Sequence, residues 1–333
     1  MAAGRKSRIF SATAWNDWLS RRSVKLALKA LQFLLVGGVV IYLISRVSEI
    51  GWGEVRRSLP ESIWFYLLFG VMYFVIPVSE LLSYKAMRWP IGFSSLPMFV
   101  RKRVYNYAVM SYSGEAYMFL WAKRHMNFRG RQILSMVKDN NLLSGLASNS
   151  FTLLLVAAFF ATGRLDTITR AQPDAGSYIA ATALVGILMV LVVLGLNRRI
   201  MSVPFPMAAR ITGIHASRVV LILLLQTAQW AVVFPHVPFL TWLLFLTAQM
   251  VLTRLPFLPN QDLMMVGLGL SLTHYVDAPE AAVVGMFLVS GALFQAVNLG
   301  FFLLTSVGDH APRGDETIDP ADMVEDDLEQ ARP

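Results

Sequence analysis

Charged and amide side chains inside apolar segments are the residues of this chain that could do chemistry. The stretch from Arg101 to His125, RKRVYNYAVMSYSGEAYMFLWAKRH, is mostly apolar and aromatic between two basic ends, yet Glu115 lies near its centre, directly after Gly114. An ionisable side chain at membrane depth costs free energy, and such residues commonly mark a substrate or ion path. Glu115 is therefore the first candidate for binding a charged or hydroxyl-bearing group.

This stretch predicts a hairpin that enters the membrane and turns back near Ser113 and Gly114. Its apolar interval, Val104 to Ala122, is about long enough to cross a bilayer, which takes about 20 residues. Both ends are basic, however, and the positive-inside tendency places both in the cytoplasm. Irregular backbone at that depth is tolerated where protein or a water-filled cavity surrounds it. In the alternative, Glu115 lies in an interfacial loop and caps a half-helix or pairs with Arg124.

Polar residues of other apolar segments extend the set of substrate-binding candidates. Glu80 lies near the cytoplasmic end of a predicted helix, where it either lines a substrate path or reaches Lys85 or Arg88. Asp262 lies just inside a stretch rich in proline and glycine, and Asn298 lies in the last apolar segment. Arginines at the cytoplasmic mouth can attract a phosphate through charge-assisted hydrogen bonds. The full candidate set is Glu115, Gly114, Ser113, Asn106, Arg101, Arg103, Arg124, Asp262, Asn298 and Glu80.

The composition indicates a multi-pass membrane protein. Of the 333 residues, 56% are hydrophobic and 15% are charged, which excludes a soluble globular protein. The formal net charge of +8 combines a basic membrane part with an acidic end, and basic residues beside spans indicate topology and contacts with anionic lipids. The absence of cysteine and of any HxxxH spacing argues against a metal site, and no basic soluble face is present for a nucleic acid.

The apolar runs predict an all-α fold with seven or eight transmembrane helices and two re-entrant or broken elements. A basic cytoplasmic leader (1–25) precedes the transmembrane domain (26–307), and an acidic tail (308–333) is expected to be disordered. The two irregular elements, Arg101–His125 and Leu255–Val276, occupy comparable places in the two halves, as in transporters with internal repeats. The predicted spans are Leu26–Val47, Ile63–Tyr84, Leu142–Thr162, Tyr178–Leu196, Val219–Phe234, Val237–Val251 and Ala281–Ser306.

Three connections between these spans carry recognisable signals. The residues NFRGRQILSMVKDN predict an amphiphilic connection ahead of Leu142, and FPHVP predicts a tight proline turn that makes a helical hairpin of the spans on either side. A cytoplasmic loop ahead of Val219 is marked by Arg198, Arg199, Arg210 and Arg218.

A series of short motifs runs through the chain in a recognisable order. They are Arg88-Trp89, Asn106, Ser113-Gly114-Glu115 and Ser135 with Lys138-Asp139-Asn140, followed late by a membrane element rich in proline and glycine. In this order they resemble the flippase-like family typified by the transmembrane region of lysylphosphatidylglycerol synthase, over about Ile41 to Val307. The chain departs from the family pattern where Tyr112 and Ser113 replace a proline, where Met118 replaces an arginine, and where Asp139-Asn140 replaces a Glu-Arg pair.

The resemblance implies a lipid flippase or lipid-headgroup transporter of the bacterial inner membrane, with a cytoplasmic N-terminus. Its partners would be membrane lipids with an anionic or amphiphilic headgroup, and it implies neither an enzyme nor a cofactor. No GxxxxGK[ST] motif for nucleotide hydrolysis is present. Two alternatives stay open: an accessory or scaffold subunit that has lost transport, and a membrane-embedded enzyme acting on a lipid or polyprenyl phosphate. The sequence leaves the lipid, the energy coupling and homo- or hetero-oligomerisation open.

We predict that the N-terminus and the segments around Arg101 and Arg129 lie in the cytoplasm, because basic residues cluster there. A reporter that is active in the periplasm should give no activity when it is fused after residue 125. A fusion in the loop Gly163–Ser177, which is expected to face outward, is the positive control. Strong activity of the fusion after residue 125 would mean that Arg101–His125 crosses the membrane.

Overall fold

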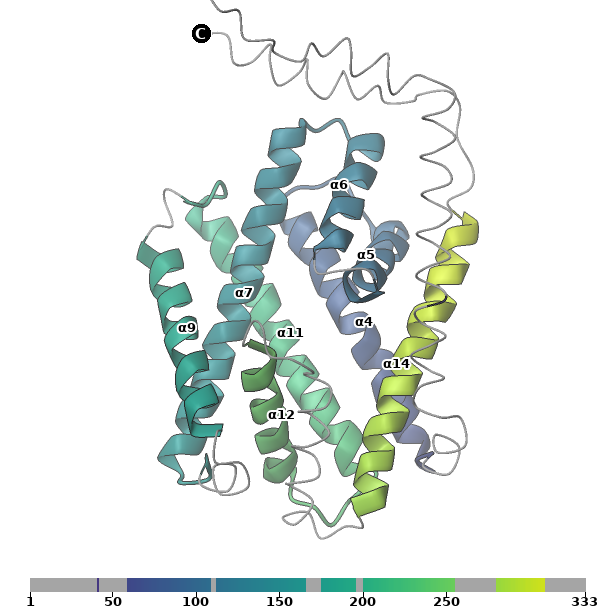
Figure 1. The fold of residues 1–333 in the computed structure, drawn as a ribbon. Coiled ribbons are helices and arrows are strands. Elements are labelled where there is room, and N and C mark those ends of the chain that lie inside the picture. Colours follow the sequence, from purple (N-terminus) through teal and green to yellow (C-terminus); the bar gives the residue numbers. More distant parts are fainter. Residues whose placement is uncertain are drawn as a thin grey trace, which may run out of the picture.

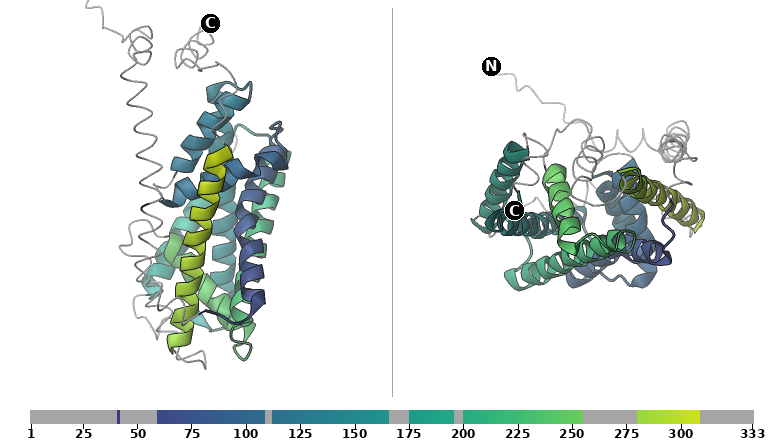
Figure 2. Two further views of the ribbon diagram at one scale, coloured as in Figure 1. Left: turned by 90° about the vertical axis from the view of Figure 1, so that its right-hand side faces the viewer. Right: turned by 90° about the horizontal axis from the view of Figure 1, so that it is seen from below.

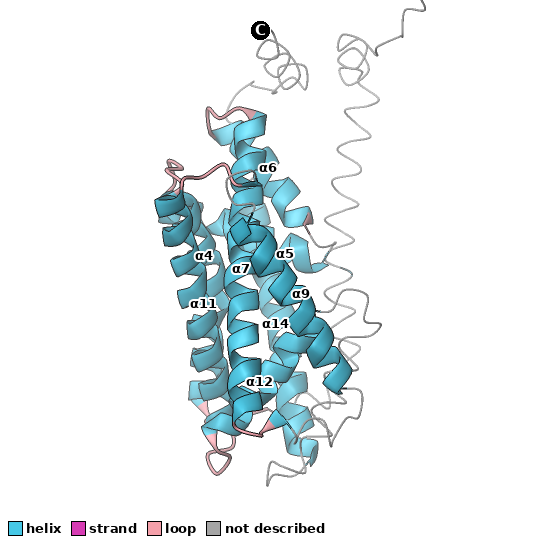
Figure 3. Cartoon of the chain, turned by 90° about the vertical axis from the view of Figure 1, so that its left-hand side faces the viewer, coloured by secondary structure: helices cyan, strands magenta, loops and turns pink. Residues whose placement is uncertain are grey.

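The computed structural model of the protein describes residues 41, 59–108, 112–165, 175–195, 200–254 and 280–308. Within these ranges the regular structure consists of eight α-helices and a short 3-10 helix, η1 (Phe93–Ser95). Figures 1 and 3 show how the helices are arranged. The predicted all-α class is confirmed. The α-helices are α4 (Ile63–Ala86), α5 (Leu96–Ala108), α6 (Ser113–His125), α7 (Gly130–Ala161), α9 (Ala175–Gly195), α11 (Phe205–Ala231), α12 (Phe239–Arg254) and α14 (Glu280–Gly308).

Five of these helices are long and apolar enough to cross a membrane, and the protein is therefore a multi-pass membrane protein. The apolar part of α12, Phe239–Val251, is shorter than these spans. The predicted span Leu26–Val47, apart from Ile41, and the predicted element Leu255–Val276 lie outside the described residues. The five candidate spans are Ile63–Ala86, Gly130–Ala161, Gly176–Val193, Phe205–Ala231 and Gly285–Thr305.

The helices form an elongated bundle with α9 and α14 at opposite edges (Figures 1 and 2). In the middle of the bundle, α11 packs against α4, α7 and α12, and α9 packs against α7 and α12. The short helices α5 and α6 pack on each other near one end, where α5 also contacts α4 and α14 and α6 contacts α7. The hairpin of α5 and α6 is therefore held by three of the long helices.

Two helices begin well before the predicted spans. The predicted connection ahead of Leu142 is helical from Gly130, because Ile133, Val137 and Asn140 recur at helical spacing on the buried side of α7. Similarly α11 begins at Phe205, so the predicted cytoplasmic loop is wrong over 205–218.

α11 begins early because its first turns carry a stripe of buried residues. Arginines in the same segment made this stripe hard to recognise from the sequence. Ala208, Ile211 and His215 are buried at the spacing of one helix face, and Pro206 in the first turn suits a helix start. Arg210 and Arg218 therefore lie on a membrane helix instead of in a loop.

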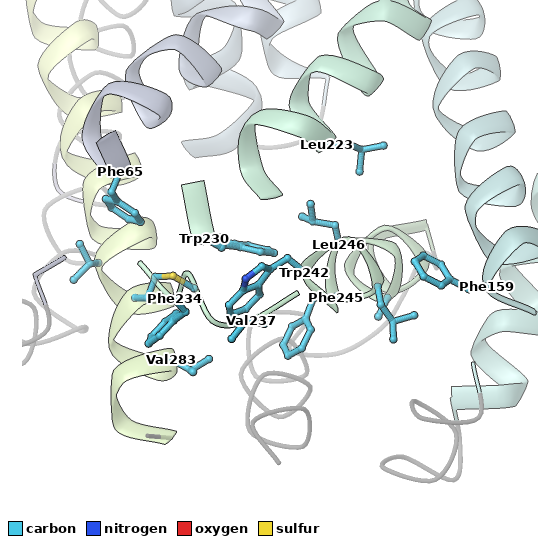
Figure 4. Close-up of a cluster of buried hydrophobic side chains, with 14 of the residues drawn as sticks. Phe65, Phe159, Leu223, Trp230, Phe234, Val237, Trp242, Phe245, Leu246 and Val283 are labelled. Carbon is cyan, nitrogen blue, oxygen red and sulfur yellow. The ribbon is translucent and has the colours of Figure 1, made fainter. Parts of the chain in front are cut away.

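The predicted proline turn between the fifth and sixth spans is confirmed. It joins the end of α11 to the start of α12, with the backbone N–H of Val237 donating to the Phe234 carbonyl over 3.1 Å. Aromatic rings gather beside this turn, among them Trp230 and Trp242, whose centroids are 5.7 Å apart (Figure 4). Together with Phe287 they join α11, α12 and α14 at the end of the bundle away from α6.

Asp139 ties α7 to the segment that leads into α11. Its side chain is fully buried, and Oδ2 accepts hydrogen bonds from the backbone N–H groups of Ser202 (2.8 Å) and Val203 (3.0 Å). Lys138, whose side chain is 45% exposed, lies 3.2 Å from Oδ1 and also donates to the Ile200 carbonyl. One carboxylate thus satisfies two backbone donors and sets the entry of α11 beside α7.

Asp139→Ala should lower the free energy of unfolding by about 3 kcal/mol, since two backbone donors lose their acceptor at roughly 1–3 kcal/mol each. Denaturant unfolding in detergent micelles measures this loss. Lys138→Ala is the matched control, and it should cost less than Asp139→Ala, because the lysine side chain is 45% exposed and both backbone donors keep their acceptor. Equal losses in the two variants would show that the ion pair, and not the backbone contacts, carries the stability.

Candidate functional site

An ion cluster joins α4, α5 and α6 and is formed by Glu80, Lys102 and Glu115. Lys102 Nζ lies 2.8 Å from Glu80 Oε2 and 3.3 Å from Glu115 Oε1. The lysine side chain is 1% exposed, and the side chains of Glu80 and Glu115 are 17% and 14% exposed. One buried ammonium group therefore compensates two carboxylates that come from two other helices.

The turn between α5 and α6 positions Glu115. Asn106 Oδ1 accepts a hydrogen bond from the backbone N–H of Gly114 over 2.6 Å, and Ser113 Oγ donates to the Tyr105 carbonyl over 2.7 Å. Helix α5 ends at Ala108, α6 begins at Ser113 and the two helices pack on each other, whereas the membrane depth predicted for this hairpin stays a prediction. Glu115 lies in the first turn of α6, where the helix dipole favours a negative charge.

Gly114 lets α6 approach the backbone of α5. A Cβ atom at this position would overlap the carbonyl oxygen of Lys102 and would lie 2.8 Å from Asn106 Oδ1. The residue against which Gly114 packs is thus the residue that pairs with Glu115. The close approach of the two helices and the ion cluster depend on the same glycine.

Arg103 extends the polar region from α5 toward α4 and α14. Its Nη1 donates to the Tyr73 carbonyl over 2.5 Å, and its guanidinium lies 4.6 Å from the ring centroid of Tyr73 and 4.9 Å from that of Phe294. The Tyr73 hydroxyl in turn donates to Asn298 Oδ1 over 2.8 Å. Arg103 and Asn298, two candidates from distant segments, therefore meet on one tyrosine.

The remaining candidates have other surroundings. Arg101 is buried between α6 and α14, with its guanidinium 5.4 Å from the ring centroid of Tyr117 and 5.8 Å from that of Phe302. Arg124 is exposed in the last turn of α6, about 13 Å along the helix axis from Glu115 at 1.5 Å per residue. Asp262 lies outside the described residues.

The partners proposed for the two acids in the alternative interpretations differ from those observed. Glu115 pairs with Lys102 and not with Arg124, and Glu80 pairs with the same lysine and not with Lys85 or Arg88. The reason is that α5 folds back beside α4, which brings a residue of the basic cluster at 101–103 into the interior.

Lys102, His215 and Arg218 are site residues that the sequence patterns did not indicate. His215 is fully buried on α11, with Nε2 3.0 Å from Asn140 Oδ1 and 3.3 Å from Ser83 Oγ. Arg218 Nη2 donates to Ser144 Oγ over 3.1 Å. The available signal for the two α11 residues was their spacing of three, which places both on one helix face.

These residues carry the polar region from the ion cluster across the bundle. Lys102 and Arg218 both interact electrostatically with His215, and Glu80 interacts with Arg103 and Arg218. Within the described ranges, no group of three histidine, aspartate or glutamate side chains is placed to hold a metal ion. The region is therefore suited to binding a polar group through charge and hydrogen bonds.

No family model, curated protein or solved structure matches the chain. The function is accordingly inferred from the contacts around Lys102.

Gly114→Ala should destabilise the protein by about 1–3 kcal/mol, the usual cost of overpacking, because the added methyl meets backbone that cannot move aside. Gly213→Ala on α11 is the matched control, since its Cβ would meet no atom within 4 Å. Thermal unfolding of both variants in one detergent measures the difference. A Gly114→Ala variant as stable as Gly213→Ala would contradict the close packing of α5 on α6.

Proposed function

We propose that the protein is a lipid flippase or lipid-headgroup transporter of the bacterial inner membrane, with a cytoplasmic N-terminus. It moves an amphiphile between leaflets without nucleotide hydrolysis. The observation that carries the proposal is the buried ion cluster of Glu80, Lys102 and Glu115 beside a membrane-spanning helix. Ionisable residues in the interior of a membrane bundle commonly mark the route of a polar substrate.

Stability alone is a poor reason for three charges in this place. A buried ion pair often contributes no more stability than well-packed apolar side chains of similar volume. Moreover, Glu115 Oε2 is buried and accepts no hydrogen bond from any residue in the described ranges. A carboxylate oxygen without a donor is costly, and a hydroxyl or amine of a headgroup would satisfy it.

The charges around the ion cluster favour a headgroup that carries an anionic group beside its hydroxyl or amine. Lys102, Arg103 and Arg218 carry three positive charges, against the two negative charges of Glu80 and Glu115. Guanidinium groups suit the oxygens of a phosphate through charge-assisted hydrogen bonds. The site therefore fits a phospholipid headgroup, with Glu115 holding its hydroxyl or amine end.

The contacts of the motif residues support a flippase-like architecture. Arg88 has a left-handed φ of 66° directly after α4, and the Trp89 ring packs 4.6 Å from that of Tyr84. Asn106 binds the turn at Gly114, and Asp139 binds the entry of α11. Each motif thus sets a helix end or a chain reversal. A scaffold subunit that has lost transport could share these contacts, and the functional test must separate the two.

Glu115→Gln should insert and fold normally, since Lys102 keeps its contact with Glu80, yet it should transport lipid at least about tenfold more slowly. Losing a hydrogen bond to a charged group, worth about 1.5–3 kcal/mol, accounts for such a change. The measurement is translocation of fluorescent phospholipids in proteoliposomes at matched protein abundance.

Glu61→Gln is the matched control, because Glu61 is an exposed acid just before the first residue of α4, whereas the ion cluster lies near the last turns of that helix. It should transport at the wild-type rate. Full transport by Glu115→Gln would refute the role of the ion cluster. A wild-type protein that moves no lipid, with lower stability in Glu115→Gln, would instead favour the scaffold function.

A further inference from the structure

We infer that Gln295 and Asn298 of α14 form a second part of the substrate site and bind the hydroxyl groups of a phosphate-bearing headgroup. The two residues are called the amide pair below. The inference rests on the proposed function, because it names the class of headgroup that such a transporter carries. It is drawn from two buried amide atoms of α14 that have no hydrogen-bond partner among the described residues.

The amide pair offers one donor and one acceptor that have no hydrogen-bond partner among the described residues. Asn298 is 0% exposed, and its Nδ2 has no hydrogen-bond acceptor among the described residues. Gln295 is 6% exposed, and its Oε1 likewise has no donor in the described ranges. Each unsatisfied buried group costs roughly 1–3 kcal/mol. Residues three apart share a helix face, so the two amides lie on neighbouring turns of one surface.

Arg103 and Tyr73 lie between this surface and the ion cluster. Arg103 interacts electrostatically with Glu80 and donates to the carbonyl of Tyr73, and the Tyr73 hydroxyl donates to Asn298. Tyr73 lies about 10 Å along α4 from Glu80, at 1.5 Å per residue. Polar groups therefore lead from the cluster through Arg103 and Tyr73 to the amide pair.

The amide pair lies near the middle of an apolar candidate span. Gln295 is at the centre of the apolar span Gly285–Thr305, and Tyr73 is near the centre of the span Ile63–Ala86. Aromatic side chains surround these residues. The rings of Tyr73 and Phe301 stack with centroids 5.4 Å apart, and the ring centroids of Phe294 and Tyr107 are 4.8 Å apart. Neutral amides in such surroundings bind a polar group without adding another charge to the hydrocarbon region.

The chemistry of the free atoms selects among headgroups. A hydroxyl both donates and accepts, so one or two hydroxyls satisfy Gln295 Oε1 and Asn298 Nδ2 together. An ammonium group would leave Asn298 Nδ2 unsatisfied, and a bare phosphate dianion would leave Gln295 Oε1 unsatisfied. With Arg103 adjacent for the phosphate, the arrangement points to a phosphodiester that bears a glycerol, inositol or sugar.

The test compares two short-chain lipids in binding and in transport. Dihexanoyl phosphatidylglycerol carries hydroxyls beyond its phosphate and dihexanoyl phosphatidic acid does not. We expect the wild-type protein in detergent to bind the first more tightly, as measured by native mass spectrometry. Gln295→Met, which keeps the side-chain length, should reduce this preference roughly tenfold, the effect of about one hydrogen bond. The same ratio is then measured for long-chain fluorescent forms in proteoliposomes.

Variants of the Tyr73–Asn298 hydrogen bond serve as controls for structure. Tyr73→Phe removes the hydroxyl that bonds Asn298 but keeps the amide pair, so it is the reference with which the double variant is compared. The double variant Tyr73→Phe with Asn298→Leu removes the bond and the amide together without leaving an orphaned hydroxyl, so the preference should fall as in Gln295→Met. Arg103→Gln should weaken binding of both lipids by similar factors.

The outcomes separate the inference from the function on which it rests. Equal binding of the two lipids by the wild-type protein, or an unchanged preference in Gln295→Met, overturns the role of the amide pair. Selective binding that depends on the amide pair, without translocation of any lipid, supports the amide pair as a hydroxyl site and overturns the flippase proposal.

Discussion

Lys102 is the residue on which the polar half of the structure depends. It is buried between two carboxylates, and neither acid has another ion-pair partner among the described residues within 4 Å. Removal of a buried partner leaves an uncompensated charge, at a cost of roughly 3–5 kcal/mol. The ammonium group thereby fixes the relative positions of α4, α5 and α6.

The two ends of the bundle are held together by different forces. Around the turn between α11 and α12, the bundle is held by packing of aromatic rings such as Trp230, Phe245 and Phe287. At the other end, Asp139 of α7 accepts a hydrogen bond from the segment that leads into α11. Asn140 of α7 is hydrogen-bonded to His215 of α11. Ring packing is insensitive to a polar ligand, whereas hydrogen bonds and ion pairs can be exchanged for ligand contacts. A polar ligand would therefore change contacts at the end that holds α5 and α6.

Span order followed from hydrophobic runs, because a membrane helix must be apolar over its length. The same criterion placed the starts of α7 and α11 too late. The part of a helix that extends beyond the lipid needs apolar residues on its buried face only, and it tolerates arginine on its other faces. Glu115, Gly114 and Asn298 were found because polar or small residues are conspicuous in an apolar run. Lys102 was not found, because the basic cluster at 101–103 lies at a predicted membrane boundary and has the pattern of a topology signal. Its burial depends on the fold-back of α5, a contact between distant segments that no local pattern encodes.

The length of α7 affects how the protein meets lipids of different chain length. Its 32 residues span about 48 Å, against about 30 Å for the hydrocarbon core of a bilayer. Helices adapt to hydrophobic mismatch by tilting, and α9 lies at the edge of the bundle with many exposed apolar residues. The hairpin of α5 and α6 is held to α4 through Lys102 and packs against α7, so its position in the bundle is set by protein contacts. The ion cluster consequently keeps its position relative to α4 when the thickness of the surrounding membrane changes.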